Sequence, residues 1–513
     1  MVIPIKQKIF FILLFILFGI GYNYQHTLSM FPASKHKWRQ SDAYSQTLNY
    51  YHENNALLEP KIHLYNSVEG KGAGEFPLLY YVNASIWKLT GESVFLIRFE
   101  TMLLLFLGLF SLFRLTAVFV NDPWFRLLVP FLVFASPVIA FYGDNYLVNI
   151  SALSFVFVSW DLIIRGDLKS RRWRMYVGFM VLTLAALLRP TMIIAYLPLF
   201  IYFLYKAQIK RSWKEFFSKT IWLFVASTII PAAWIMYIRY YNDLNNSVYF
   251  LTDFVPFWTQ DIGAVMESFK KVVMVELYPT IFIFLLLALF VFTTYKFYRL
   301  NKTYFLILLT TFLLVVIYFA LWFGNFNVHD YYLIEFFVFI PLVFGGYYYL
   351  VEQKGRYLKH IRYVSLVLLL LYLIPYSVTR TRIKYATSDA ALAPLFISVD
   401  EIELWKWSEW YDKDWYQAFE EIRPLLRKHG INRDEIVITF GDPTSNYTLS
   451  LMDQKGYTDL YNGHLDRNQK VEFYKKTGAK YLILNHDDLR KEIDSTFTND
   501  RVLKYRNISV YRL

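Results

Sequence analysis

The chain has 513 residues, of which 56% are hydrophobic and 20% aromatic, and its mean hydropathy is +0.31. Soluble globular proteins contain about 45–50% apolar residues, so this excess excludes an ordinary soluble protein. The absence of cysteine excludes disulfides, thiolate catalysis and cysteine metal sites. The net charge of +12 does not indicate nucleic-acid binding, because most cations lie in short loops between apolar segments, where they set membrane topology.

The apolar residues form about eleven blocks, most of them roughly 17–25 residues long, which is the length needed to cross the hydrocarbon core as a helix. Lys6 and Lys8 precede the first block and no cleavage site of small residues follows it, so we expect an uncleaved first helix. Pro190 separates the fifth and sixth blocks. The predicted spans are 9–29, 96–119, 124–141, 147–164, 175–188, 191–206, 220–239, 278–297, 303–322, 332–350 and 362–378.

Lysine and arginine clusters precede the first span and follow the fourth, sixth, eighth and tenth spans. All of them fall on one side of the membrane, which the positive-inside rule makes the cytoplasmic side. The N-terminus is then cytoplasmic. A long first loop (30–95), a tight turn at 142–145 and the C-terminal region are predicted to be extracytoplasmic.

The first loop concentrates charge and aromatic residues. Its segments 43–51 and 77–87 carry aromatic faces at helical spacing, which predicts helices lying in the membrane interface. Within residues 36–44 (HKWRQSDAY), Asp42 is the candidate catalytic carboxylate, and Lys37 and Arg39 would keep it ionised. The alternative is that Asp42 caps a helix N-terminus.

Other ionisable residues lie near span ends on the same predicted face, where charge is costly and therefore a sign of function. The remaining candidates are Glu75, Asp144, Arg189, His329 and Asp330, with Tyr331 and Tyr332 beside them. Plainer alternatives stay open for four of them: an exposed loop residue for Glu75, a turn residue for Asp144, a snorkelling side chain for Arg189 and an interfacial histidine for His329.

From about residue 381 the chain has the patterning of a soluble domain. We predict an amphipathic helix over 415–428 with Phe419, Ile422 and Leu426 on one face, and a second helix over 471–477. Segments 436–440 and 480–484 predict strands, and 509–511 a last edge strand. Alternating helices and strands indicate a small α/β domain. The predicted domains are thus 1–380, in the membrane, and 381–513, soluble.

The order of these features resembles the GT-C membrane glycosyltransferases, in particular protein mannosyltransferase-like and lipid A aminoarabinose transferase-like enzymes. The features are Trp-Arg-Gln-x-Asp at 38–42, Glu-x-Pro-Leu-x-Tyr-Tyr at 75–81, Tyr-Gly-Asp-Asn at 142–145 and His-Asp-Tyr-Tyr at 329–332. The resemblance covers roughly residues 1–380 and rests on the order and sidedness of the set, since no single motif is specific.

The resemblance implies a mainly α-helical polytopic protein of a bacterial-type inner membrane that serves a cell-envelope pathway. It implies a polyprenyl-phosphate sugar donor and a lipid, glycan or protein acceptor. Asp42 would work at the reaction centre with Asp144 as a second acid. Tyr331 or Tyr332 would lie near the lipid phosphate, and Arg189 would be a phosphate partner. The chain departs from the aminoarabinose transferases at Glu75, where they have a lysine, so another cation or a bridging metal must meet the phosphate.

Elementary chemistry leads to a similar reaction. Phosphate leaves an anomeric carbon as a stable anion, so the reaction mainly needs a base for the acceptor hydroxyl and positive charge near the phosphate. One base opposite the leaving group implies inversion, and Arg189 or His329 could meet the phosphate. No cofactor is required, although a divalent ion held by Asp42 with Asp144 or Glu75 is a hypothesis. The alternative functions are a transporter or lipid flippase, and a non-catalytic assembly protein; the absence of visible repeats disfavours a transporter.

Overall fold

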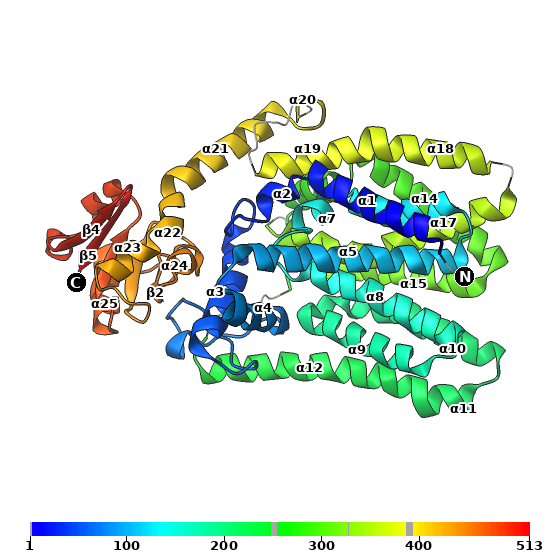
Figure 1. Cartoon of the computed structure of the whole chain (residues 1–513), viewed down its shortest axis with the longest axis horizontal. Coiled ribbons are helices and arrows are strands. Elements are labelled where there is room, and N and C mark those ends of the chain that lie inside the picture. The colour runs from blue at the N-terminus through cyan, green and yellow to red at the C-terminus, as the bar shows by residue number, and fades with distance from the viewer. Residues whose placement is uncertain (1–2, 248–253, 327, 356, 386–392) are drawn as a thin grey trace. The chain divides into compact units, whose positions relative to one another are not determined.

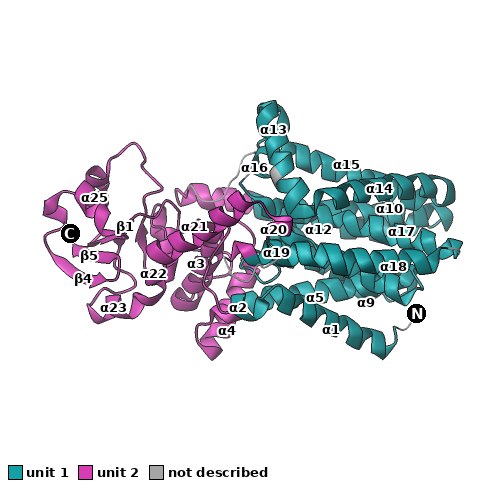
Figure 2. Ribbon diagram, turned by 90° about the horizontal axis from the view of Figure 1, so that it is seen from above, with its two compact units in different colours: residues 1–28, 98–235, 252–382 teal, residues 29–97, 236–251, 383–513 magenta. Residues whose placement is uncertain are grey.

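The computed structural model describes residues 3–247, 254–326, 328–355, 357–385 and 393–513. By their internal contacts the residues group into two compact units (Figure 2). Unit 1 comprises Met1–Leu28, Arg98–Ile235 and Thr252–Arg382, and unit 2 comprises Ser29–Ile97, Met236–Leu251 and Ile383–Leu513. The predicted domain boundary at residue 380 stays a prediction, because these units are defined by contacts and not by independent folding.

Long apolar helices make up most of unit 1 (Figure 1). Among the described residues, eight helical segments are long and apolar enough to cross a membrane. These segments are Val94–Phe119 (α5), Asn149–Leu168 (α8), Pro190–Ile209 (η2 and α10), Trp213–Leu244 (α11, η3 and α12), Thr280–Leu300 (α14), Lys302–Leu321 (α15), Asp330–Lys354 (η6 and α17) and Leu358–Lys384 (α18, η7 and α19). The chain is therefore a multi-pass membrane protein.

Shorter helices occupy the other three predicted spans. They are α1 (Ile5–Gly21), α6 and α7 (Pro123–Phe134 and Pro137–Tyr142) and α9 (Arg172–Leu188). Because α1 and α9 have 17 residues each and α6 has 12, the predicted count of eleven spans is not confirmed. The remaining short helices of unit 1 are α2 (Tyr24–Thr27), η4 (Phe257–Thr259), α13 (Ile262–Ser268), η5 (Phe269–Leu277) and α16 (Phe323–Phe326).

Local sequence explains where α6 begins and how closely α5 and α8 pack. The Asp122 side chain accepts hydrogen bonds from the backbone N–H groups of Trp124 and Phe125, and a proline stands at the first helical position. Between α5 and α8, a Cβ on Gly108 would lie 2.7 Å from Ser154 Cα. Only glycine permits this approach, as is common where membrane helices pack through small residues.

The first-loop part of unit 2 contains α3 (Lys37–Glu53), η1 (Val68–Gly70) and α4 (Leu78–Thr90). Helices therefore cover both stretches that the aromatic spacing predicted to be helical. In α4, Tyr81, Ile86 and Leu89 are exposed, whereas residues 39–50 of α3 are all buried. This burial of α3 on every side differs from the one-sided burial of a helix that lies in a membrane interface.

The C-terminal part of unit 2 is a five-stranded sheet with helices on both faces. Its strand order is β2-β1-β3-β5-β4, with β2, β1 and β3 parallel and with β5 antiparallel to both β3 and β4. The strands are β1 (Val437–Phe440), β2 (Gly456–Tyr457), β3 (Tyr481–Leu484), β4 (Arg501–Tyr505) and β5 (Ile508–Arg512). The helices are α20 (Ala393–Phe396), α21 (Val399–Trp415), α22 (Gln417–Glu421), α23 (Arg423–Lys428), α24 (Tyr447–Met452), α25 (Arg467–Lys476), η8 (Asp487–Glu492) and η9 (Ser495–Phe497).

Alternation along the strands divides the core between the two faces. Val437 and Ile483 pack with buried residues of α22, α23 and α24, among them Phe419, whereas Ile438 and Leu482 pack with residues of α25. The predicted small α/β domain is confirmed. Two details of the prediction were wrong.

The helix predicted over 415–428 is interrupted, and the strand predicted as an edge lies inside the sheet. α22 ends at Glu421 and α23 begins at Arg423, next to Pro424, whose ring and missing N–H disfavour a continuous helix. β5 lies between β3 and β4, because the turn at Arg506 and Asn507 folds β4 back on β5 as a hairpin. β4 is half exposed and lacks the alternation of apolar and polar residues that would have predicted a strand.

Candidate active site

Asp42 lies on a helix that is both polar and buried. The sequence of α3, KWRQSDAYSQTLNYYHE, is mostly polar, yet Gln40, Ser41, Asp42 and Gln46 are no more than 2% exposed. A helix that is polar all round is normally found in contact with solvent. Burying so many polar groups is costly unless each is hydrogen-bonded. The buried polar side chains of α3 therefore lower the folding stability of unit 2.

The Asp42 carboxylate has partners on two sides within unit 2. Asn446 Nδ2 donates a hydrogen bond to Asp42 Oδ1 at 2.8 Å, and Arg39 Nη1 lies 3.5 Å from Asp42 Oδ2, one helical turn earlier. α3 begins at Lys37, so Asp42 lies inside the helix, and the alternative that it caps the N-terminus is wrong.

Glu75 is the second partner of Arg39. Arg39 Nη2 donates to both carboxylate oxygens of Glu75 at 2.6 Å, and the Tyr80 hydroxyl donates to Glu75 Oε1. Burial alone would raise the pKa of Glu75, but the Arg39 charge and the hydrogen bonds outweigh it, so the pKa lies below its ordinary value. The Glu75 side chain is 10% exposed, so the alternative of an exposed loop residue is wrong.

Lys37, which we expected to keep Asp42 ionised, has a different partner. Its ammonium group pairs with Asp412 on α21 and lies over the rings of Tyr416 and Tyr447, at 4.2 and 4.9 Å from their centroids. Arg39 is therefore the cation that stands beside Asp42.

In unit 1, Asp144 is buried in the turn between α7 and α8. The Thr27 hydroxyl donates to Asp144 Oδ2, and Arg98 donates to the Asp144 backbone carbonyl at 3.0 Å. Burial raises the pKa of Asp144 to about 6, although Arg98 and Thr27 act in the opposite direction. Gly143 is required here, because a Cβ at this position would lie 2.2 Å from the Tyr24 hydroxyl.

The segment 330–332 begins η6 (Asp330–Val338) and faces α7. The Tyr142 hydroxyl donates to Asp330 Oδ1, and the rings of Tyr142 and Tyr331 meet edge to face. Asp330, Tyr331 and Tyr332 are buried, whereas His329 is partly exposed and contacts both tyrosine rings. Unit 1 thus brings the predicted turn and the predicted His-Asp-Tyr-Tyr segment together through Tyr142.

Arg189 is held by a residue that the sequence analysis missed. Its Nε donates to Glu335 Oε1 at 2.6 Å, Thr191 donates to the same oxygen, and the guanidinium lies 4.4 Å from the Tyr332 ring centroid. The alternative of a snorkelling arginine without a partner is wrong. The available signal was a single carboxylate within the apolar segment LIEFFVF, since such a charge is rarely left unpaired.

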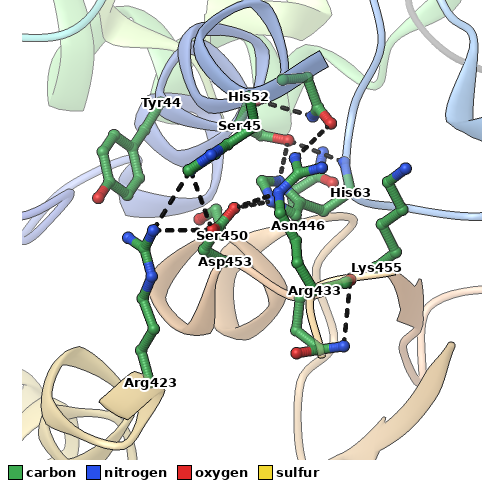
Figure 3. A network of polar contacts seen from close by, with 12 residues as sticks. Tyr44, Ser45, His52, His63, Arg423, Arg433, Asn446, Ser450, Asp453 and Lys455 are labelled. Carbon is green, nitrogen blue, oxygen red and sulfur yellow. Dashed lines mark hydrogen bonds and ion pairs between the residues drawn. The ribbon is translucent and has the colours of Figure 1, made fainter. Parts of the chain in front are cut away.

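A second carboxylate that the sequence analysis missed is Asp453, just after α24. His63 Nε2 and Arg433 Nε contact Asp453 Oδ1 at 3.0 and 2.8 Å, and His52 Nε2 and Arg423 Nη2 contact Oδ2 at 3.3 and 2.9 Å (Figure 3). Burial alone would raise the pKa of Asp453, but these partners hold it far below its ordinary value. The network ties the first-loop residues His52 and His63 to the C-terminal sheet domain.

Ser45, His63 and Asp453 stand in the order of a nucleophilic triad but cannot act as one. Ser45 Oγ lies 2.7 Å from His63 Nδ1 and accepts the His63 backbone N–H at 2.9 Å. Ser45 and His63 are fully buried, which leaves no room for an acyl group at the hydroxyl. Within the described ranges, no group of three or more acidic or histidine side chains is arranged to hold a metal ion.

The fold is similar to those of solved membrane glycosyltransferases of the GT-C type. ArnT from Cupriavidus metallidurans has a similar structure in the apo state (TM-score 0.56, 10% identity) and bound to undecaprenyl phosphate (TM-score 0.57, 12% identity). Each alignment covers 98% of this chain and 97% of ArnT. The arabinofuranosyltransferase AftD from Mycobacteria is also similar (TM-score 0.51, 12% identity), over 98% of this chain and 40% of AftD. The sequence matches neither a protein-family model nor a curated protein.

Proposed function

We propose that the chain is an inverting glycosyltransferase that uses a polyprenyl-phosphate sugar as donor and Asp42 as its catalytic carboxylate. The observation that carries the proposal is a buried carboxylate on a buried polar helix within a GT-C fold. ArnT bound to undecaprenyl phosphate supports a polyprenyl-linked donor. The acceptor is a lipid, a glycan or a protein on the same membrane face.

In this reaction the acceptor hydroxyl oxygen attacks the anomeric carbon as the bond from that carbon to the phosphate oxygen breaks. The phosphate leaves with the bonding electrons, and the hydroxyl proton passes to Asp42 as general base. Attack opposite the leaving group inverts the anomeric configuration. Arg39, 3.5 Å from Asp42, favours the ionised form that can accept a proton.

The unit 1 residues are proposed to bind the donor. Arg189 supplies positive charge for the lipid phosphate and His329 can donate a hydrogen bond to it, beside Tyr331 and Tyr332. Asp144 is the second acidic group, and its pKa of about 6 allows it to exchange a proton near neutral pH. The reaction is proposed for the extracytoplasmic face, which the distribution of lysine and arginine in the loops predicts, and the resemblance to GT-C enzymes implies a bacterial-type inner membrane.

An apolar cavity in unit 1 also fits a lipid substrate. It has a volume of about 350 Å³, and its lining includes Leu112, Trp160, Tyr202, Ile307 and Tyr349, from helices α5, α8, α10, α15 and α17. The lining lies toward the ends of α10, α14 and α17 that precede the lysine and arginine clusters, so only the distal part of a long polyprenyl chain would reach it from an extracytoplasmic phosphate.

The test is sugar transfer by Asp42→Asn in membranes that contain the expressed chain. Undecaprenyl phosphate linked to radiolabelled mannose, aminoarabinose or arabinose serves as the donor panel, and label is counted in lipid, glycan and protein fractions. Asp122→Asn is the matched control, because Asp122 is also a buried aspartate and its side chain caps α6 in unit 1, where asparagine can cap as well.

We expect Asp42→Asn to abolish transfer and Asp122→Asn to retain it in proportion to folded protein. Wild-type turnover by a folded Asp42→Asn variant would refute the mechanism. Movement of the donor across vesicle bilayers without any sugar transfer would support the transporter alternative instead.

A further inference from the structure

Asn446, in the C-terminal sheet domain, contacts the proposed catalytic carboxylate directly. Its Nδ2 lies 2.8 Å from Asp42 Oδ1, although 404 residues separate the two in the chain. Asn446 is fully buried and Asp42 is 2% exposed. A hydrogen bond to a buried charged group is stronger than one between neutral groups at the surface.

The orientation of the Asn446 amide is determined by its other partner. The backbone N–H of Leu64 donates to Asn446 Oδ1 at 2.9 Å, and a backbone N–H has no capacity to accept. The oxygen must therefore face Leu64, and the NH₂ group must face Asp42. Both ends of the amide are used, so the side chain can only serve as a donor toward the carboxylate.

The segment that carries Leu64 is itself anchored on the sheet. Leu64 forms a parallel bridge to Gly456 of β2, supported by hydrogen bonds between Gly456 N and His63 O at 3.0 Å and between Tyr65 N and Gly456 O at 2.8 Å. The first loop thus extends the sheet at its β2 edge. This pairing holds Leu64 and Asn446 in register, so Asn446 has little freedom to turn away from Asp42.

Asn446 does not cap its own helix, α24, although it stands at the N-cap position. It occupies the N-cap position of α24, where asparagine commonly accepts a backbone N–H, yet its side chain makes no capping bond. Other residues cap the helix: Thr444 Oγ1 accepts the Tyr447 N–H at 3.0 Å, and Asp442 Oδ2 accepts the Thr448 N–H at 2.8 Å. The amide is therefore reserved for partners outside α24.

We propose that Asn446 is a positioning residue for Asp42, and that the C-terminal domain thereby takes part in the sugar-transfer reaction. This inference rests on the proposed function. Asn446 holds Oδ1 from the sheet domain while Arg39 stands beside Oδ2 on α3, so both elements contribute to fixing the carboxylate plane. A general base must be aligned with the hydroxyl proton to within a fraction of an ångström.

The contact is tested by exchanging its two side chains in the full-length chain. Asn446→Asp places two carboxyls 2.8 Å apart and should lower the melting temperature. The double variant Asp42→Asn with Asn446→Asp restores one amide and one carboxylate, and should recover most of the loss. Asn485→Asp is the control, because Asn485 is also fully buried in the sheet domain but bonds to Gly441 and Asn507.

The control substitution Asn485→Asp should lower the melting temperature by the same amount whether residue 42 is aspartate or asparagine. Transfer is then measured with the donor that supports the wild type. In folded Asn446→Ala we expect kcat to fall by about tenfold to a hundredfold with an unchanged KM for the donor, as for a misaligned catalytic group. The exchanged double variant should melt like the wild type and remain inactive.

The outcomes separate the two proposals. The positioning role would be overturned if the changes in melting temperature of the two single variants simply add in the double variant, or if Asn446→Ala keeps the wild-type kcat. In either case, sugar transfer by the wild type would still support the proposed function. A different result is possible, in which the variants at positions 42 and 446 show strongly non-additive changes in melting temperature but the wild type transfers no sugar. It would overturn the proposed reaction and still support the link between Asn446 and Asp42.

Discussion

Acid should destabilise unit 2 through His63, and the structure sets the size of the effect. His63 is fully buried between Ser45 and Asp453, and burial lowers its pKa from 6.5 to about 4. The hydrogen bond to Asp453 opposes this shift, and Arg433 adds to it. The folded state therefore keeps the ring neutral at pH values where an unfolded chain binds a proton.

The sign and the magnitude follow from proton linkage. Below pH 6.5 the unfolded state binds more protons than the folded state, so stability falls as pH decreases, until His63 also titrates in the folded state near pH 4. The full loss is about 3 kcal/mol, of which about 2 kcal/mol is reached between pH 7.5 and pH 5. Asp453 and Glu53 have pKa values held below their ordinary range, so they contribute mainly below pH 5. Glu420, whose pKa burial raises to about 7, and Asp144 act in the opposite direction, because the folded state binds protons on them between pH 7.5 and pH 5. The His63 contribution is therefore measured as the difference between the wild type and His63→Gln.

The assay is thermal unfolding of the purified chain in detergent, followed by tryptophan fluorescence at pH 7.5 and pH 5. A loss of about 2 kcal/mol corresponds to about 4–8 °C for a domain of 150–250 residues. His63→Gln should melt lower than the wild type at pH 7.5, and this difference should shrink by about 2 kcal/mol at pH 5. The exposed His464 provides the control, and His464→Gln should keep the wild-type response. An acid-induced drop in His63→Gln as large as in the wild type would refute the reasoning.

Three further changes test the fold and the turn at Asp144. Phe419→Ala should destabilise unit 2 by about 3–5 kcal/mol, because it removes a fully buried ring, and the melting temperature against the wild type measures this loss. Asp144→Asn should raise the melting temperature at pH 7.5, since ionising a carboxyl with a pKa of about 6 costs the folded state about 3 kcal/mol; the gain should vanish as the pH falls through 6 toward 4. Gly456→Val should increase protease cleavage within 430–513, because a Cβ would lie 2.1 Å from Val437 O; unchanged cleavage would contradict this packing.

Much of the architecture could be predicted because short stretches of sequence carry the patterns typical of helices and strands. Apolar blocks of membrane length mark the helices of unit 1, and the strands Val437–Phe440 and Tyr481–Leu484 are short apolar segments next to turn residues. The helix at Asp42 was predicted as well, although its first turn was placed six residues too late, because the start at Lys37 has no side-chain capping bond. Single half-exposed elements such as β4 were missed because they carry no such pattern.

The sequence by itself determined that the chain is a multi-pass membrane protein with a small α/β domain, and it singled out Asp42 as the first candidate. Only the tertiary structure decided the partners: Asn446 for Asp42, Glu75 for Arg39 and Glu335 for Arg189. Asn446 and Glu335 lie 404 and 146 residues from their partners, and no periodicity links positions that far apart. Helices and strands arise from contacts between near neighbours, whereas a buried charge is matched only when the chain has folded and excluded water around it.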